Sequence, residues 1–531
     1  MKLHVLTQGS TAKAVTESLP GLIERKVASR IAAKDFTVWG KDAEAESSIR
    51  LGWVSSANDS QPLVERILSL KKEFNEQGVD RFVLCGMGGS SLAPEVITNS
   101  AHVELVVLDS TNPEQVRHAL AGDLQRTAVV VSSKSGSTVE TDSQKRLFER
   151  AFSEAGIDKT DRIVVVTDPG SPMEQAAIAD GYRVFNADPT VGGRYSALTA
   201  FGLVPSGLAG ADIQTLLNDA VAASGLFSED VVDNPALVLG AALARTKNGD
   251  AYADKIIIVE DGTQIKGLGD WAEQLIAEST GKLGKGILPV VVPAGANELH
   301  TGSEDQLVVR LGGAGSAAAN DQVVVTGTLG AQFLLWEYAT VIASELIGIN
   351  PFDQPDVESA KIAARGMLEG RADEVHEDFS EDGVEVRARG FDLGSAHSLK
   401  EALDALLSTV SEDGYISIHA YLDRTSFGSA NELRELVAKR SGRPTTFGWA
   451  PRFLHSTGQY HKGGPAQGVY LQIVSRASND LDVPGRDFTL GELIASQAAG
   501  DAAVLAEHGR PVLTLTVSDV SSGLELIRRS I

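Results

Sequence analysis

The chain has little cysteine, little positive charge and no long apolar runs. Its 531 residues include one cysteine, Cys85, which excludes a disulfide framework and a zinc site built from cysteines. No run approaches the roughly 18 apolar residues that a membrane-spanning helix needs. The opening stretch, MKLHVLTQGSTAKAV, lacks the apolar core of a signal peptide. We therefore expect a soluble, cytoplasmic protein.

Negative charge dominates the composition. The chain has 71 Asp and Glu residues against 47 Lys and Arg, for a formal net charge of −24. This excess argues against nucleic acid and anionic membrane surfaces as partners. It leaves room for a local basic site that binds a small anion. Hydrophobic residues make up 43% of the chain, which is enough for sizeable cores, and the length predicts two to four domains.

Short apolar runs alternate with helix-like segments from about residue 60. Examples are RFVLCG, TAVVVSS and RIVVVTD, and later DKIIIVED and GILPVVVP. Such alternation is typical of an α/β fold with mainly parallel sheets. We predict a helical N-terminal extension over residues 1–55, a first domain over 56–207 and a second over 208–531. The second includes a C-terminal extension, with an acidic, glycine-bearing excursion at about 369–397.

Two polar turns follow strands of the first domain. SSKSGSTVET (132–141) comes after the run TAVVV, and GMGGSSLAP comes after RFVLC. Open α/β sheets bind ligands beyond the carboxyl ends of their strands, and the helix that follows offers unpaired N–H groups to an anion. Neither turn has the GK[ST] of a P-loop, and GMGGSS is no dinucleotide fingerprint. Gly and Ser also build purely structural turns, but two such turns in one block favour a phosphate pocket without a nucleotide.

Five motifs, in order, resemble those of phosphoglucose isomerases, which belong to the sugar isomerase (SIS) superfamily. They are GMGGSSLAP, SKSGSTVET, GGRYS (192–196), AESTGK (277–282) and NPFDQPDVESAK (350–361). The tail APRFLHSTGQYHKGGP (450–465) resembles the isomerase half of bifunctional transaldolase/phosphoglucose isomerases. The resemblance implies two SIS-type α/β/α sandwiches, usually in a homodimer with the site near the interface. It also implies interconversion of glucose 6-phosphate and fructose 6-phosphate through a cis-enediolate, with no metal or other cofactor.

The same resemblance implies roles for individual residues. Glu278 of ESTGK would be the base that moves a proton between C1 and C2, and Arg194 would stabilise the enediolate. Lys361 would lie near the ring oxygen. Thr280 stands where the family usually has Asn. For each charged residue the alternative is an ordinary surface or ion-pair role. The substrate phosphate would bind to Gly89, Ser90, Ser133, Lys134, Ser135 and Thr138.

The histidine that opens the sugar ring is harder to assign. In the family it lies between the glutamate and the lysine, in a stretch like GQHAFYQL. Here the histidine between Glu278 and Lys361 is His300, whose surroundings differ from that stretch. LHSTGQYHKGG resembles it better but follows Lys361. We favour His455 as the ring-opening acid, with His461 and His300 as alternatives. We expect no metal there, because no carboxylates cluster around His455 and His461.

Two other functions stay open. Some SIS enzymes with a similar serine-rich loop accept both glucose and mannose 6-phosphate, so a dual phosphoglucose/phosphomannose isomerase is one alternative. SIS domains also serve in regulators, so a non-catalytic sugar-phosphate sensor is the other. Glu278, Arg194 and Lys361 favour an enzyme, since a sensor needs the phosphate loop but no base. In every case the expected partner is a small sugar phosphate, with neither nucleic acid nor membrane.

Overall fold

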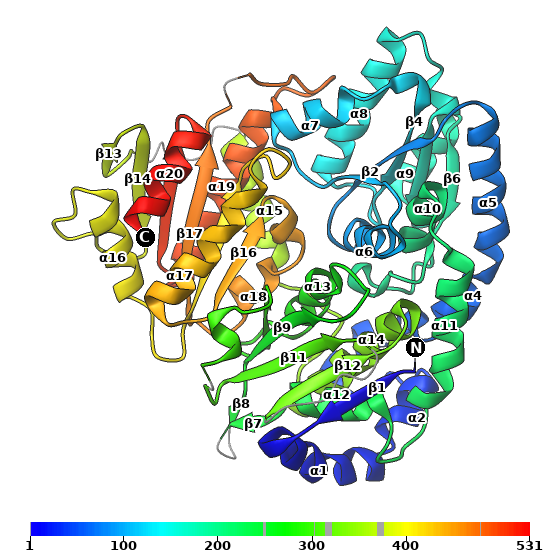
Figure 1. Cartoon of the computed structure of the whole chain (residues 1–531). Helices are drawn as coiled ribbons and strands as arrows, with labels where there is room; N and C mark the ends of the chain where they lie inside the picture. Colours follow the sequence, from blue (N-terminus) through cyan, green and yellow to red (C-terminus); the bar gives the residue numbers. More distant parts are fainter. Residues whose placement is uncertain (1, 248–250, 302, 314–320, 369–375, 478) are drawn as a thin grey trace.

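Three sheets of mainly parallel strands form the framework of the protein (Figure 1). This computed structural model describes residues 2–247, 251–301, 303–313, 321–368, 376–477 and 479–531. We name three units after the sheets. The first unit runs from α5 to α10 (61–209), the second comprises β1 to α2 and α11 to α14 (4–32 and 213–347), and the third runs from β13 to α20 (379–530).

The first sheet has five parallel strands in the order β3-β2-β4-β5-β6. Their β-branched runs are buried on both faces, as expected for a parallel sheet. Val130 belongs to the core shared with α5, α6 and α10, whereas Val129 and Val131 pack with α7, α8 and α9 on the other face. The elements are β2 Arg81–Gly86, β3 Val106–Leu108, β4 Thr127–Ser132, β5 Ile163–Thr167, β6 Arg183–Asn186, α5 Gln61–Glu76, α6 Leu92–Ala101, α7 Pro113–Leu120, α8 Val139–Glu154, α9 Pro172–Ala179 and α10 Ala200–Ala209.

The second sheet has the order β1-β12-β11-β9-β10. All its pairings are parallel except that of β1, which runs antiparallel to β12 with His4 opposite Thr326. Helix was expected for the opening residues, so this strand differs from the sequence-based prediction. Its elements are β1 His4–Thr7, β9 Lys255–Asp261, β10 Leu288–Val292, β11 Gln306–Gly312, β12 Gln322–Thr326, α1 Gly9–Glu24, α2 Val27–Ala32, α11 Ile213–Phe227, α12 Pro235–Leu243, α13 Leu268–Thr280 and α14 Leu329–Ile347. A small hairpin, β7 Thr246–Lys247 and β8 Ala251–Tyr252, precedes β9, and the short helices α3 Glu44–Ser47 and α4 Ser56–Asp59 precede α5.

The third sheet has six strands in the order β13-β14-β18-β17-β15-β16. The four strands from β18 to β16 are parallel, and β13 and β14 form an antiparallel pair at one edge. The helix α15, Val357–Leu368, leads into this unit and packs against α19. The elements are β13 Phe379–Glu381, β14 Val384–Arg389, β15 Tyr415–Tyr421, β16 Thr445–Trp449, β17 Gly468–Ser475, β18 Val512–Val517, α16 Leu399–Ser408, α17 Leu433–Ser441, α18 Gly458–Gly463, α19 Leu490–Glu507 and α20 Val520–Ser530.

The predicted α/β class with mainly parallel sheets is confirmed. The third sheet lies wholly within the residues that we expected to complete the second domain, and our domain boundaries stay a prediction. Of the acidic excursion at 369–397, residues 369–375 lie outside the described residues, while 379–389 form β13 and β14. Among the described residues, no helix combines the length and the apolar character needed to cross a bilayer.

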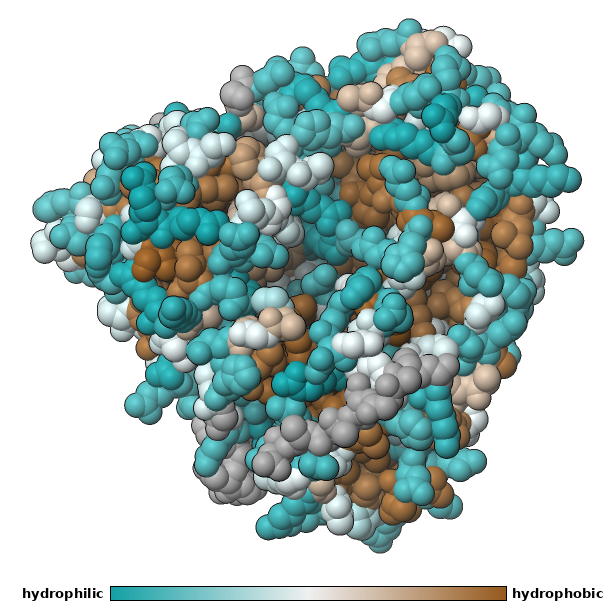
Figure 2. All heavy atoms as spheres, viewed as in Figure 1, coloured by the Kyte–Doolittle hydropathy of each residue, from teal (hydrophilic) through white to brown (hydrophobic). Residues whose placement is uncertain are grey.

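The three units meet around the helix α13, at the centre of the molecule in Figure 1. Hydrophilic side chains surround a hollow between the units in Figure 2. The end of α13 packs directly against α18 of the third unit, because a Cβ on Gly281 would lie 2.4 Å from the Cα of Tyr460. A glycine is therefore required where the motif AESTGK of the second unit touches the third.

Candidate active site

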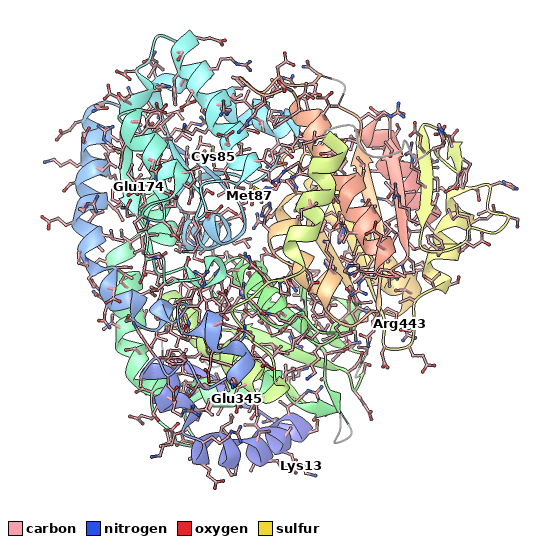
Figure 3. The ribbon with its side chains drawn as sticks, turned by 180° about the vertical axis from the view of Figure 1, so that it is seen from behind. Lys13, Cys85, Met87, Glu174, Glu345 and Arg443 are labelled. Carbon is pink, nitrogen blue, oxygen red and sulfur yellow. The ribbon has the colours of Figure 1, made fainter. Side chains whose placement is uncertain are left out.

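A cavity of about 630 Å³ lies where the three units meet. Its floor is formed by the two turns that follow β2 and β4 of the first sheet, as predicted for the carboxyl ends of parallel strands. One side is formed by α13, and the third unit closes it with the short turn Arg452–His455, which we call η9. Met87 also lines the cavity; it is labelled near the centre of Figure 3, which shows the molecule from behind.

The cavity contains all the predicted site residues except Lys361. The residues that line it and were predicted from sequence are Gly89, Ser90, Ser133, Lys134, Ser135, Thr138, Arg194, Glu278 and His455. Lys361 belongs to α15, and its side chain lies outside the described residues. Its role near the ring oxygen therefore stays a prediction.

The turn after β4 presents its polar groups on one side of the cavity. Gly136 has a φ of +69°, a left-handed conformation that glycine adopts without strain, and its N–H donates to Ser133 Oγ at 3.2 Å. The hydroxyls of Ser133 and Thr138 lie 3.1 Å apart. Because α8 begins directly after Thr138, the positive end of the helix dipole adjoins this turn. These are the features of an anion-binding turn.

Lys134 brings a positive charge to the same turn. Its Nζ lies 2.5 Å from Asp168 Oδ2, in a loop after β5. Burial lowers the pKa of the Lys134 ammonium and raises that of the Asp168 carboxyl, although each charge opposes the shift of the other. Asp168 thus holds the lysine in place beside the hydroxyls, with its ammonium available to an incoming anion.

Glu278 and Arg194 form a buried ion pair opposite the turn that follows β4. Arg194 Nη1 lies 3.4 Å from Glu278 Oε1, and both residues are less than a tenth exposed. Gln274, one helical turn earlier on α13, donates from Nε2 to Glu278 Oε2 at 3.1 Å. A charged pair in such a dry position interacts more strongly than one at the surface. The carboxylate is consequently fixed in orientation from two sides.

Arg194 is held by a full set of acceptors. Its Nε donates to Ser279 Oγ at 2.8 Å, and its terminal nitrogens donate to Gln354 Oε1 at 2.8 Å and to the carbonyl of Pro351 at 2.6 Å. The guanidinium is planar with five donors, so this arrangement fixes its plane as well as its position. The charge is thereby preorganised for an anion that forms in the cavity.

Lys282 supports the loop that accepts these bonds. Its Nζ donates to the carbonyl of Asn350 at 2.7 Å and to both the carbonyl and the carboxylate of Asp353 at 2.6 Å. Burial and the nearby Arg194 lower the pKa of the Lys282 ammonium to about 8. The lysine of the ESTGK motif therefore acts beneath the site, on the loop that orients Arg194.

His455 reaches the cavity from the third unit. Its Nε2 lies 2.8 Å from Glu140 Oε1 at the start of α8, and Gln497 of α19 donates to the same oxygen at 2.7 Å. Its backbone carbonyl accepts from Gln274 Nε2 at 2.8 Å. Glu140 and His455 are 315 positions apart in sequence, so this contact joins the first and third units at the site.

The other two candidate histidines do not line this cavity. His461 lies inside the third unit, where its Nδ1 is 3.0 Å from the hydroxyl of Tyr415. Burial holds the pKa of the His461 imidazole well below its usual range. His300 follows a short turn and is exposed. Of the three histidines, His455 is therefore the one that the geometry favours.

Several contacts of the candidate site residues were not predicted from the sequence. Glu140 lies within the motif SGSTVET, and Gln274 precedes Glu278 by four residues, so its place on the same helix face could have been read from the spacing. Gln354 lies within the motif NPFDQPDVESAK. Gln497 carries no comparable signal, and it reaches Glu140 only because distant segments pack together. In the described part of the chain, no group of three or more His, Cys, Asp or Glu side chains could hold a metal ion.

The fold and this cavity define an α/β protein with an anion-binding turn facing a buried carboxylate–guanidinium pair and a carboxylate-bound histidine. A family model for phosphoglucose isomerase matches residues 55–287. A probable glucose-6-phosphate isomerase of Natronomonas pharaonis is 31% identical over 373 residues, which cover 60% of this chain and 86% of the relative. One of Haloarcula marismortui is 30% identical over 344 residues, covering 55% and 78%.

Solved structures agree on the fold. A hypothetical protein from Thermus thermophilus superposes with a TM-score of 0.59 at 24% identity, covering 69% of this chain and all of that one. A glucose-6-phosphate isomerase from Chlamydia trachomatis gives 0.53 at 19% identity, covering 66% and 85%. The two curated relatives, each at least 30% identical and covered over more than two thirds of its length, show that the chain belongs to the phosphoglucose isomerase family.

Proposed function

We propose that this protein interconverts glucose 6-phosphate and fructose 6-phosphate, the isomerase step shared by glycolysis and gluconeogenesis. The observation that carries the proposal is the arrangement of one cavity: the phosphate-type turn faces the buried pair Glu278–Arg194 and the pair His455–Glu140. Membership of the phosphoglucose isomerase family supports it. A cavity of about 630 Å³ is large enough for a hexose phosphate.

The phosphate would bind at the turns after β2 and β4. Ser133, Ser135 and Thr138 offer hydroxyl donors, and Lys134 offers a charge-assisted bond. This anchor is remote from the reacting carbons, so its binding energy serves to place C1 and C2 near the opposite side of the cavity. Gly89 lets the turn after β2 pack closely against the backbone of Gly193, since a Cβ at position 89 would lie 2.1 Å from the carbonyl oxygen of Gly193.

His455 would open the sugar ring by moving a proton between the C1 hydroxyl and the ring oxygen. The carboxylate of Glu140 binds Nε2 of the imidazole and fixes the plane of the ring. Gln497 holds that carboxylate in turn. A positioned imidazole is the side chain best suited to proton transfer near neutral pH. Lys361 near the ring oxygen is a further proposal, which rests on the family resemblance alone.

Glu278 would carry the proton between C1 and C2 of the open chain. Its carboxylate abstracts the proton from one carbon, and the electron pair left behind forms a cis-enediolate, whose negative charge lies on the oxygen nearest Arg194. The proton then returns from Glu278 to the neighbouring carbon, while a hydroxyl proton passes between the two oxygens of the enediolate, so that the carbonyl forms on the carbon from which the first proton was taken. The guanidinium is already oriented by Ser279, Gln354 and Pro351, so little reorganisation is needed when the charge appears. No metal is required for these steps.

We further propose a homodimer in the cytoplasm, as the family resemblance implies. Light scattering on the purified protein tests the first part: a mass near 112 kDa, twice the 56.0 kDa of the chain, is expected. A mass equal to that of the single chain over a wide concentration range would contradict it. Fractionation of cells that express the protein tests the second part.

The decisive experiment is an NMR time course of the EDTA-treated protein with fructose 6-phosphate in heavy water. Glucose 6-phosphate with partial deuterium at C2 is expected, because a proton held on a carboxylate exchanges with solvent in some turnovers. Glu278→Gln should abolish the signal. Glu273→Gln, on the same helix but outside this cavity, is the matched control and should retain it.

Two other outcomes would change the assignment. Mannose 6-phosphate that accumulates at a catalysed rate would indicate a dual phosphoglucose/phosphomannose isomerase. Absence of product, together with line broadening that shows the sugar phosphate to bind, would indicate a sugar-phosphate sensor and would remove Glu278 from the chemistry.

A further inference from the structure

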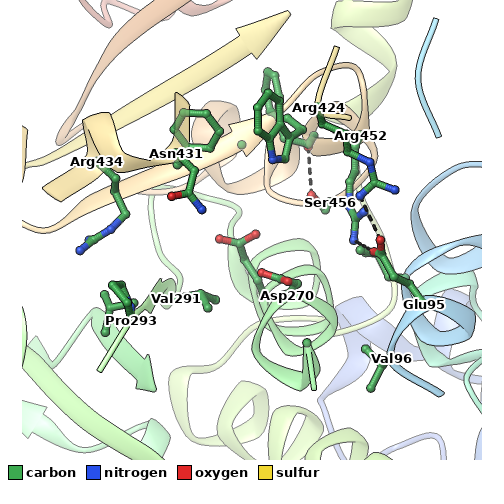
Figure 4. A pocket seen from close by; sticks show the side chains of 18 of the residues that line it. Glu95, Val96, Asp270, Val291, Pro293, Arg424, Asn431, Arg434, Arg452 and Ser456 are labelled. Carbon is green, nitrogen blue, oxygen red and sulfur yellow. Dashed lines mark hydrogen bonds and ion pairs between the residues drawn. The ribbon is translucent and has the colours of Figure 1, made fainter. Parts of the chain in front are cut away.

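A four-residue charge network joins the third unit to the first, beside the turn that carries His455. The acids belong to the first unit: Glu95 lies in α6, and Asp109 directly follows β3. The bases belong to the third: Arg424 follows β15, and Arg452 begins η9. Figure 4 shows both guanidinium groups converging on Glu95, with Ser456 nearby.

The contacts of this network are close and mostly shielded. Arg452 Nη1 lies 3.1 Å from Asp109 Oδ2, and its Nη2 forms a short ion pair with Glu95 Oε2. Arg424 Nη1 lies 3.0 Å from the other oxygen of Glu95. The side chain of Arg452 is 12% exposed and that of Asp109 is 1% exposed. Each carboxylate therefore faces both guanidinium groups, and Asp270 of α13 is a further acid whose charge acts on Arg452.

Glu95 and Arg452 stabilise each other's charged forms. Burial alone would raise the pKa of Glu95, but Arg452 and Arg424 outweigh it and hold that pKa at about 2. Burial would likewise lower the pKa of Arg452, but Asp109 and Glu95 outweigh it and raise that pKa. Removing one member of such a set leaves an uncompensated charge in a poorly solvated place, which is costly.

Only two residues lie between Arg452 and His455, and both ends of this turn are held by the other units. Arg452 is bound at one end to Glu95 and Asp109. At the other end, the imidazole of His455 is bound to Glu140 and its carbonyl to Gln274. A four-residue 3₁₀ turn is too short to absorb a shift at one end without moving the other.

The ion pairs of Arg452 lie beside a cavity. Arg452, Glu95 and Arg424 line a second cavity of about 430 Å³, the one drawn in Figure 4, which is distinct from the candidate active site. The guanidinium groups thus border open space rather than a close-packed core. Loss of the Arg452 charge would leave this end of η9 beside open space, whereas the His455 end packs closely on the first unit, since a Cβ on Gly88 would lie 2.6 Å from the carbonyl oxygen of His455.

We propose that Arg452 is a positioning residue for His455. Through its ion pairs with Glu95 and Asp109, it fixes η9 against the first unit, so that the imidazole meets Glu140 at the edge of the cavity. Arg424 balances the second negative charge and keeps the acids in place. As far as it concerns turnover, the proposal rests on the proposed isomerase function.

The test compares Arg452→Met with Arg476→Met. Methionine keeps much of the apolar stem of arginine but removes the charge. Arg476 also pairs with a glutamate, Glu385, but within the third unit and at the surface, with a side chain 62% exposed. For Arg452→Met we expect kcat to fall about a hundredfold through misplacement of the imidazole. The KM for fructose 6-phosphate should change little, because the phosphate turns are untouched. Arg476→Met should leave both unchanged, and Arg452→Lys should restore part of kcat.

A second readout does not depend on activity. In protein labelled with ¹⁵N at its ten histidines, the imidazole signal of His455 is assigned by its disappearance in His455→Gln. Arg452→Met should shift or broaden this signal, because the bond to Glu140 is disturbed. The signal of His461, bound to Tyr415 inside the third unit, should stay in place as the internal reference.

The outcomes separate the two proposals. If the wild-type protein has no isomerase activity but the His455 signal responds, the proposed function fails and the positioning role stands. If the wild-type is active while folded Arg452→Met keeps both its kcat and its His455 signal, the positioning role is wrong. Should Arg452→Met fail to fold, Glu95→Gln takes its place with the same readouts and a smaller expected loss.

Discussion

The two sides of the active-site cavity are built in opposite ways. The side to which we assign the phosphate comes from two short stretches that follow strands of one sheet, 87–90 and 132–138; the first is mostly buried, and the second is partly exposed from residue 134 onward. The side to which we assign proton transfer comes from three segments, which contribute Arg194, Glu278 and His455, and its ion pair is buried. A binding turn can thus be encoded locally, whereas a set of acid, base and charge stabiliser depends on how the units pack.

The difference has a chemical reason. A phosphate is fully charged in the ground state, so hydroxyls, a lysine and a helix terminus can bind it even in the presence of water. An enediolate exists only transiently, and its stabilisation needs preoriented charges away from solvent. Arg194 meets that need through three acceptors supplied by α13 and the 351–354 loop.

The largest effect is expected on the buried side, from Glu278→Gln. The amide is nearly isosteric but has no carboxylate to accept the C1 or C2 proton, so kcat should fall by at least about a thousandfold. Binding of fructose 6-phosphate, measured by calorimetry, should stay within a few-fold. Weakened binding with near-normal turnover at saturation would contradict the role of Glu278 as base. It would then be a binding residue, like those on the other side of the cavity.

The next largest effect is expected from His455→Gln. Ring opening also proceeds slowly without the enzyme, so we expect a loss in kcat of about a hundredfold on the cyclic substrate, measured in a coupled assay. His300→Gln changes an exposed histidine outside the cavity and is the control, with no expected loss. If the control lost activity and His455→Gln did not, the ring-opening acid would have to be reassigned.

A smaller and different effect is expected on the phosphate side, from Lys134→Ala. Loss of one charge-assisted bond should raise the KM for fructose 6-phosphate about tenfold to a hundredfold, with a lesser change in kcat. Inhibition by inorganic phosphate should weaken in parallel. An unchanged affinity for both ligands would refute the anion-binding assignment of this turn.

The smallest effect is a pH dependence that comes from Lys282. In the folded protein the pKa of the Lys282 ammonium is about 8, below the ordinary value of 10.5. The ammonium therefore loses its proton as pH rises through about 8 instead of through about 10.5. The bonds to Asn350 and Asp353 then weaken, and with them the loop that orients Arg194. We expect kcat to decline a few-fold between about pH 7 and pH 9. Lys282→Arg stays charged throughout this range, so the same decline in that variant would contradict the explanation.

The same contrast decides how much could be predicted from sequence. The α/β class follows from strand-length apolar runs, and the anion-binding turns follow from strand ends rich in Gly and Ser. Glu278 and Arg194 were identified through motifs whose spacing the family shares. His455 was favoured by local resemblance alone, since no pattern in one chain reveals that Glu140, 315 positions away, binds its imidazole. Gln497 had no signal at all.

The separate third sheet was likewise beyond local patterns. Its strands have the same β-branched, buried character as those of the other two sheets, so composition did not distinguish a continuation of the second sheet from a new one. Strand pairing settles it, because β15 and β17 pair with each other and not with β9 to β12. Strand pairing joins segments that are distant in sequence, and it depends on the tertiary packing of the whole chain.

The strand β1 has a consequence for how the chain is made. Residues 4–7 leave the ribosome long before their partners at 322–326, so they must wait without a sheet while the first unit is synthesised and folds. Once β12 emerges, β1 covers a sheet edge that would otherwise be open to pairing with another chain. A protein that lacks residues 1–8 would keep every residue of the cavity yet carry that open edge. Its failure would therefore be self-association, with its chemistry intact.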